Sequence, residues 1–336
     1  MVNFYFSSTT LHAMNLLRFC TLISLGLIGC TTISDNSDAE ACGFSESADI
    51  TDATSRQTIR GALLGTRYES FEALKSDIRV EYGTGSVVAG DRRPKADVVR
   101  VSHCSNGKEV VSVLTPGVHQ GHFLLARYDG NLWDRLALPF YSPYAVMNRK
   151  DMESIYILTR RRFIRFGEGD FAFFDFAKCM VENINTPDLA FKNARDTTEK
   201  GYLNSFNHIT IQAFITSSFS EEMADFIADT HERYFHPELI TGNFKKEQIA
   251  DLENGPLDNY VDMINNEWGQ ELGKQLRVKY GINRDTYWTP ALLADYLNDV
   301  QSYLGWAFQI GFEPFRPDDR KIIRFTFKIN AVMRGW

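Results

Sequence analysis

Amide, imidazole and carboxylate side chains recur at helical spacing between residues 200 and 275. Two of these side chains are four residues apart in one segment, and two are adjacent in the next segment. Three more lie within a five-residue stretch of a third segment. Side chains of these types hold metal ions, move protons or bind polar ligands. The pattern therefore predicts a polar site between three helices. The candidate residues are Asn204, His208, His231, Glu232, Asp262, Asn265 and Asn266.

Spacing also predicts how this site is oriented. His231 follows Ala224 by seven residues, so it is expected to point inward along the apolar face of its helix, with Glu232 at the margin. Gly269 and Gly273 continue the polar line of the third segment. Glycines at such a position predict that the backbone of another helix approaches closely.

Buried polar groups need partners, and three interpretations of this site remain open. These interpretations are a purely structural network, a hydrolytic or lytic site, and a site for a ligand or an ion. The pair His231 and His236 is one residue too widely spaced for H-E-x-x-H, and its imidazoles would lie about 140° apart on a helix. The sequence therefore disfavours a zinc-protease motif, names no cofactor or metal, and leaves open whether the chain is an enzyme.

Residues 200–275 resemble an uncharacterised bacterial domain family. Its pattern is N-x-F-x-H, then H-E, then M-D-x-x-N-N-x-x-G on successive helices, and the chain follows it in order and spacing. The chain departs from it at Val261, where the family often has Met, and at Asn207, where Arg is common. The family occurs in secreted, lipid-anchored and toxin-associated bacterial proteins and has no established activity. The resemblance thus implies a site and no particular reaction.

The elements that would position this site are mainly helices. An Asn106-Gly107 pair between β-branched runs predicts a hairpin, and residues 123–128 are expected to form a third strand. A helical start is expected over 58–78, whereas residues 151–166 show neither helical nor strand periodicity. Beyond these, helices are predicted over about 170–185, 202–218, 220–235, 244–253, 257–280, 289–310 and 317–334. The expected fold class is α+β, with a mainly α-helical C-terminal part and a small β-containing N-terminal part.

The first 29 residues are typical of a targeting signal. They contain no acidic residue, and Arg18 precedes an apolar run too short to span a bilayer. The run ends in Leu27-Ile28-Gly29-Cys30, which resembles the bacterial lipoprotein box. The resemblance implies that Cys30 is diacylated on its thiol and becomes the mature N-terminus, whether translation starts at Met1 or Met14. Thr31, where Asp would signal retention in the inner membrane, resembles outer-membrane sorting.

These features predict a signal peptide over 1–29, a tether over 30–57, a small α/β-containing part over 58–166 and a helical domain over 167–336. The net charge of -7 in 336 residues disfavours a nucleic-acid binder. The expected partner is the membrane, through the lipid, with an envelope protein or peptidoglycan as a second candidate.

The sequence thus predicts a membrane-anchored lipoprotein of the cell envelope that faces the periplasm from the outer membrane, or else the cell surface. The polar cluster would be a binding or structural site. The alternative is a hydrolase or lytic effector that acts on an envelope substrate. Its candidate residues would be His208, His231, Glu232 and Asp262.

Two further patterns carry expectations. An aromatic stretch is expected to pack between the two parts of the chain rather than to bind carbohydrate. It contains Trp133, Phe140, Tyr141 and Tyr144. Among the cysteines, Cys179 is expected to be buried, and Cys42–Cys104 is the favoured disulfide.

Overall fold

The computed structural model describes residues 60–85 and 96–335. The predictions for the signal peptide, the tether, Cys30 and Cys42 lie outside these residues. Within the described residues, no helix is long and apolar enough to cross a membrane. Cys179 is a buried free thiol, as expected. Cys104 forms a disulfide, and its predicted pairing with Cys42 lies outside the described residues.

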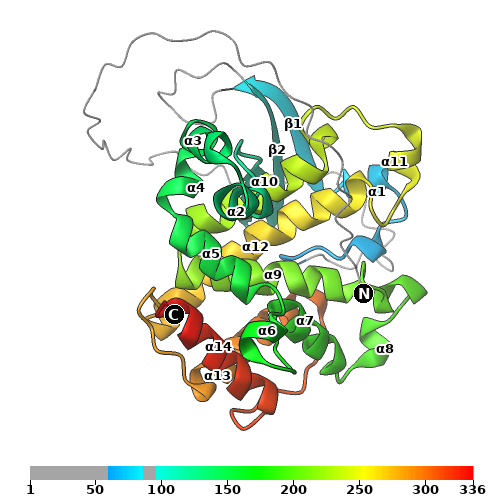
Figure 1. The fold of residues 1–336 in the computed structure, drawn as a ribbon. Helices are drawn as coiled ribbons and strands as arrows, with labels where there is room; N and C mark the ends of the chain where they lie inside the picture. Colours follow the sequence, from blue (N-terminus) through cyan, green and yellow to red (C-terminus); the bar gives the residue numbers. More distant parts are fainter. Residues whose placement is uncertain (1–59, 86–95, 336) are drawn as a thin grey trace. The chain divides into compact units, whose positions relative to one another are not determined.

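Helices dominate the described part of the chain, and one small sheet lies near its start, so the fold is α+β as predicted (Figure 1). The strands are β1 (Ile78–Gly85), β2 (Ala96–Ser105) and β3 (Lys108–Val113). The α-helices are α1 (Phe71–Leu74), α2 (Gln120–Tyr128), α3 (Leu132–Tyr141), α4 (Pro143–Met147), α5 (Arg149–Leu158), α6 (Phe163–Phe166), α7 (Phe173–Glu182), α8 (Pro187–Ala190), α9 (Tyr202–Ser218), α10 (Glu221–Phe235), α11 (Lys246–Ala250), α12 (Pro256–Tyr280), α13 (Pro290–Phe308) and α14 (Arg320–Met333). Short 3-10 turns are η1 (Gly65–Arg67), η2 (Ala194–Thr197) and η3 (Pro237–Ile240).

The sheet is antiparallel, in the order β1-β2-β3. The predicted hairpin is confirmed, because Ser105 pairs with Lys108 across Asn106 and Gly107. Both turn residues have positive φ, 56° and 76°, a backbone that Asn and Gly adopt more readily than other residues. Buried valines of β2 and β3 share a hydrophobic cluster with α12, so the sheet is held against that helix.

Helix α12 is the central element of the fold. Pro256 occupies its first turn, where no backbone donor is needed, and Gly281 ends it in a left-handed conformation. Its first half packs with the sheet through residues such as Val261 and Trp268. Its last turns, with Leu272, join the larger helical core. The two hydrophobic cores therefore meet along one buried helix.

Helix α9 runs against α12 at very short range. A Cβ added at Gly269 would lie 2.8 Å from the backbone oxygen of Ile209, and one at Gly273 would lie 2.5 Å from that of Ala213. Only glycine leaves room for such an approach. The close contact predicted from these two glycines is confirmed.

Several predictions for the first half of the chain are wrong. Residues 123–128 belong to helix α2, because a short apolar run does not distinguish a buried helical turn from a strand. Of the expected helical start over 58–78, the described residues form η1, the four-residue α1 and the first residue of β1. Strand β1 was not indicated, since its apolar side chains alternate weakly and it ends in Gly-Thr-Gly. The ambiguous residues 151–166 are most of α5, a short connection and the four-residue α6.

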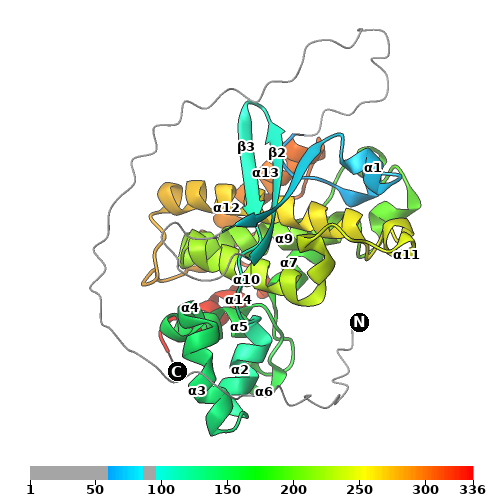
Figure 2. The same cartoon turned by 90° about the horizontal axis from the view of Figure 1, so that it is seen from above.

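Helices α2–α6, residues 120–166, gather on the opposite side of α10 from the sheet (Figure 2). We call them the aromatic lobe. The prediction that Trp133, Phe140 and Tyr141 pack between two parts of the chain is wrong, because all three are exposed. Tyr144 does pack, with its ring centroid 4.8 Å from that of Phe226 on α10.

Candidate functional site

The candidate site lies where α9, α10 and α12 meet, as the spacing predicted for most of its residues. Asn204 and His208 lie one turn apart on α9. Asp262 and Asn266 lie one turn apart on the facing side of α12. Glu232 comes from α10. Because α9 and α12 approach so closely, short polar side chains reach across the seam between them.

A chain of polar contacts runs along this seam. The Asn204 Nδ2 donates to Asp262 Oδ1 at 2.8 Å and to Asp258 Oδ1 at 3.2 Å. Lys200, two residues before α9, donates through Nζ to Asp258 Oδ2 at 2.6 Å. The Asn204 amide therefore bridges the carboxyl groups of Asp258 and Asp262, and the Lys200 ammonium group pairs with Asp258.

His208 continues the chain at its other end. Its Nδ1 lies 2.9 Å from Asn266 Oδ1, and its Nε2 lies 3.3 Å from Asp262 Oδ2. When Asn266 Oδ1 accepts from the Nδ1 proton, a second proton can sit between Nε2 and the Asp262 carboxyl. The side chain of His208 is 22% exposed, so this end of the site reaches solvent.

The carboxyl groups of the site hold their protons unusually tightly. Burial raises the pKa of Asp262 to about 7. Burial and the neighbouring Asp262 raise the pKa of Asp258 to about 7 as well. Burial lowers the pKa of His208, although its bond to Asn266 acts in the opposite direction. At neutral pH the site is therefore poised to exchange protons.

Glu232 is the least satisfied member of the site. It is buried, and burial followed by the charges of Asp262 and Asp258 raises its pKa well above the ordinary value. No hydrogen bond to its carboxyl group occurs in the described part of the chain. A buried carboxyl group without a partner is costly unless it is protonated or meets a bound species.

Asn265, a predicted candidate, does not face this site. Its Oδ1 accepts from the backbone N–H of Leu63 at 2.7 Å, and its Nδ2 donates to the Leu63 carbonyl at 2.9 Å. Ser205 Oγ also donates to that carbonyl, at 2.9 Å. Asn265 therefore holds the segment before α1 in the core, and its role is structural.

His231 also lies outside the hydrogen-bonded network, which corrects the predicted inward orientation. It is exposed, and its Nδ1 lies 3.3 Å from His119 Nε2 beside the ring of Phe235. The buried line of α10 is Ala224, Ala228 and Glu232, so Glu232 takes the inward place expected for His231.

Two residues of the site were missed by sequence reasoning. Asp258 lies one turn before Asp262, and extending the polar line of α12 backward would have found it. Lys200 lies in the turn before α9, where no periodicity applies, and no sequence signal pointed to it.

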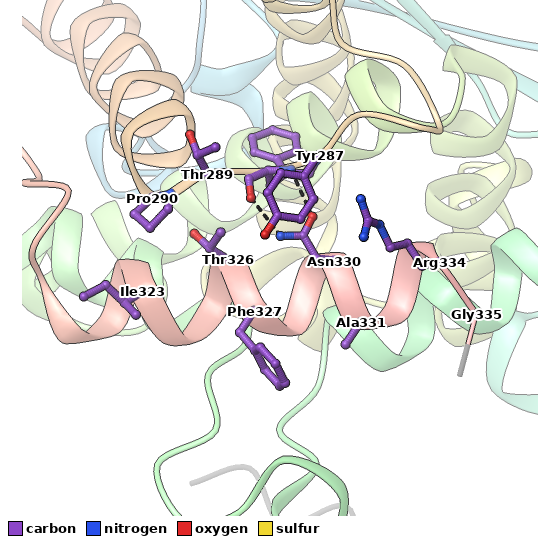
Figure 3. A pocket seen from close by; sticks show the side chains of 11 residues that line it. Tyr287, Thr289, Pro290, Ile323, Thr326, Phe327, Asn330, Ala331, Arg334 and Gly335 are labelled. Atoms are coloured by element: carbon purple, nitrogen blue, oxygen red, sulfur yellow. Dashed lines mark hydrogen bonds between the residues drawn. The ribbon is translucent and has the colours of Figure 1, made fainter.

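The described residues contain no group of three or more His, Cys, Asp or Glu side chains arranged to hold a metal ion. A hollow of about 720 Å³ lies along α14 and the residues before α13, and no candidate residue lines it (Figure 3). There Asn330 bonds both backbone groups of Trp288, and Tyr287 stacks under Arg334. The polar site follows the seam between the helices, and its His208 end reaches solvent.

Comparisons with protein-family models, curated proteins and solved structures found no match to this chain. The case for a function therefore rests on the chain's own residues.

Proposed function

We propose that this chain is a lipid-anchored protein of the bacterial cell envelope, facing the periplasm from the outer membrane. The observation that carries the proposal is the sequence Leu27-Ile28-Gly29-Cys30 at the end of a short apolar run preceded by Arg18. Two or three acyl chains on one residue would bind a membrane far more firmly than one.

The anchor is tested by replacing its thiol. In a bacterial host, Cys30→Ala is expected to abolish incorporation of labelled palmitate and to leave the signal uncut. Cys20→Ala is the matched control, because this cysteine lies inside the apolar run. Equal labelling of wild type and Cys30→Ala would refute the proposal, as would loss of labelling in Cys20→Ala alone.

We propose further that the site between α9, α10 and α12 is primarily a structural centre that binds protons. What supports this is the mutual saturation of the polar groups contributed by α9 and α12, from Lys200 through Asn204 to Asn266, which leaves out Glu232 of α10. Fully satisfied buried networks fix one arrangement of the elements that carry them. This role makes no demand for an open substrate cleft.

A hydrolytic or lytic role is the second candidate. It is favoured by Glu232, which is buried without a hydrogen bond near Asp262, the carboxyl group that His208 contacts at the solvent-reached end of the site. Such a carboxylic acid could donate a proton to a leaving group, while Asp262 and His208 would act on a water molecule.

One experiment separates these two roles. The full chain and its Glu232→Gln and His208→Gln variants are incubated with purified peptidoglycan sacculi while thermal melts are recorded. A structural centre predicts that His208→Gln lowers the melting temperature and that no variant or wild type releases soluble fragments. Release by wild type that Glu232→Gln abolishes at an unchanged melting temperature would establish the hydrolytic role instead.

A further inference from the structure

The aromatic lobe carries an apolar helix face that nothing in the described part of the chain covers. On α3, Leu132, Trp133, Leu136 and Phe140 follow one another at helical spacing. Trp133 is 78% exposed and Phe140 is 87% exposed. Large apolar side chains gathered on one face mark a surface that binds another apolar phase.

This exposure does not come from a frayed helix. Asn131 and Asp134 form a reciprocal capping box at the start of α3, with bonds of 3.0 and 3.1 Å. The base of the lobe is also fixed, because Lys328 of α14 donates to Asp170 at 2.9 Å and to the Arg160 carbonyl at 2.8 Å. Both side chains of that ion pair are buried. The helix is therefore a built element whose apolar face is left open.

Neighbouring helices of the lobe add to this exposed apolar surface. Met147 at the end of α4 is 75% exposed, and Phe163 and Ile164 on α6 are exposed as well. A shallow hollow of about 520 Å³ lies between α2, α5 and α6, with Tyr128 and Phe163 among its lining residues. The exposed groups thus include aliphatic, aromatic and tyrosyl side chains, the mixture found where proteins enter the interface of a bilayer.

Charge distinguishes the lobe from the rest of the molecule. Residues 120–166 contain eight Lys and Arg and four Asp and Glu, in a chain whose net charge is -7. Arg149, Lys150 and Arg165 are exposed, and within the described residues none of them forms an ion pair. Such a local excess of cations complements anionic lipid headgroups.

We propose that the aromatic lobe docks on the surface of an anionic bilayer, with the apolar face of α3 entering as far as the boundary between headgroups and acyl chains. Amphipathic helices with Trp, Phe and Leu on one side and basic residues nearby bind membranes in this way. The stripe of Trp133, Leu136 and Phe140 supplies the apolar contact, and the unpaired cations supply the attraction to headgroups.

This contact goes beyond the proposed N-terminal anchor. Residues 31–59, which would join Cys30 to the described body, reach about 100 Å at most if fully extended. A lipid at Cys30 therefore does not by itself bring α3 to the membrane. The lobe would be a second contact, made by the folded body.

The test measures how deeply Trp133 enters lipid. The full chain is added to phosphatidylglycerol vesicles whose acyl chains are brominated, because bromine quenches only tryptophans that reach the acyl region. Trp133 is one of five tryptophans, so its burial in lipid should remove up to about a fifth of the emission. Trp133→Phe keeps the apolar surface and should abolish this part of the quenching. Brominated phosphatidylcholine vesicles, which lack net charge, should give a markedly smaller effect.

A pair of surface variants tests the helix face itself. Leu136→Ser combined with Phe140→Ser should remove at least about half of the Trp133 quenching, because it removes most of the apolar stripe. Phe327→Ser is the matched control, since Phe327 is 66% exposed on the separate helix α14. All variants should melt at the wild-type temperature, because the replaced side chains are exposed.

The same assay keeps the lobe and the anchor apart. With Cys30→Ala, quenching of Trp133 should persist, which would support the lobe even if the anchor proposal failed. Wild-type chain that binds vesicles without quenching of Trp133 would overturn the lobe proposal and leave the anchor intact. Concentration-dependent dimers that the Leu136 and Phe140 changes dissolve, in the absence of quenching, would show that a second copy of the chain covers this face and would equally overturn it.

Discussion

At the scale of single residues, the site is defined by an imbalance of charge. Asp258, Asp262 and Glu232 are three carboxyl groups held away from water, and the Lys200 ammonium group pairs with Asp258 alone. Ionising all three would leave excess negative charge where water cannot screen it. The site therefore retains protons that free carboxyl groups would have lost, and His208 offers those protons a route toward solvent.

This proton retention predicts an unusual dependence of stability on pH. The folded-state pKa of Asp262, about 7, is above its ordinary value of 3.8, so the folded chain binds more protons between these values. The contribution of Asp262 to the free energy of unfolding should therefore be fully present below about pH 4 and be lost as pH rises to about 7. Asp262→Asn should remove one such group and flatten this decline, by up to about 1.4 kcal/mol per pH unit.

The measurement is urea unfolding of wild type and Asp262→Asn at several pH values from about 4.5 to about 7.5, a range that covers most of the interval between those two pKa values. Asn keeps an oxygen that can accept from Asn204, so the variant should still fold. Asp285→Asn, which alters an exposed carboxyl group, is the control and should show the wild-type slope. Parallel curves for wild type and Asp262→Asn would contradict the raised pKa.

Asn265 supports a second prediction at this scale. Asn265→Ala would leave the N–H and C=O of Leu63 with fewer partners inside the core. Such a loss costs roughly 1–3 kcal/mol per unsatisfied group, and the cavity left by the amide adds to it. Chemical unfolding should show this drop for Asn265→Ala and almost none for Asn243→Ala, whose side chain is exposed. A stability change below about 0.5 kcal/mol in Asn265→Ala would exclude the structural role.

The sequence allowed part of this site to be predicted, and the physical reasons for the misses differ. Helical spacing correctly brought His208, Asp262 and Asn266 to one seam, because two long helices keep their period. It failed on α10, where His231 and Glu232 differ by only about 100° and the exact orientation depends on how the helix packs. Hydrogen bonds to a distant backbone, such as those of Asn265 to Leu63, leave no periodic signal at all.

At the scale of elements, the contact between α9 and α12 sets the geometry of the whole site. Gly269 and Gly273 let the two backbones approach, and the short side chains of Asn204 and Asp262 can then meet at 2.8 Å. A wider spacing would break these bonds or demand longer side chains. The two glycines are therefore as much part of the site as the polar residues.

We expect Gly269→Ala and Gly273→Ala each to destabilise the fold by about 1–3 kcal/mol. In an isolated helix the same change would stabilise by up to about 1 kcal/mol, but here the new Cβ would meet backbone atoms that cannot move aside. The matched control is Gly83→Ala in β1, where a Cβ would meet nothing within 4 Å. Thermal melts decide the matter, and a gain in melting temperature at either helical glycine would show that the helices are not in close contact.

Element type was predictable where one local rule dominated. The Asn106-Gly107 turn fixes its hairpin through backbone preference alone, and the long helices α9 and α12 repeat their apolar period several times. Strand β1 and helix α2 lack such a rule. Their assignment depends on partners far along the chain, because β1 pairs with β2 and α2 packs in the lobe with α5.

At the scale of the whole molecule, two proposed membrane contacts differ in kind. The lipid at Cys30 would give strong attachment without orientation, because residues 31–59, which separate it from the described body, can span a long distance. The aromatic lobe would give weak attachment with a defined orientation, because α3 and the exposed cations of α5 and α6 belong to the same folded body. Together they would hold the polar site at a set distance from the bilayer, which neither contact achieves alone.

The choice between the two envelope membranes supplies a final prediction. The resemblance to lipoprotein signals assigns sorting to the residue after the lipidated cysteine, and Thr31 carries no retention signal. In an enteric host, Thr31→Asp should therefore move most of the protein from the outer-membrane to the inner-membrane fraction after density-gradient separation, with palmitate labelling unchanged. Thr31→Ser should stay in the outer membrane. Because the change touches neither the lipid nor the described body, an unaltered distribution of Thr31→Asp would mean that the chain is not sorted as an outer-membrane lipoprotein, even if Cys30 is acylated.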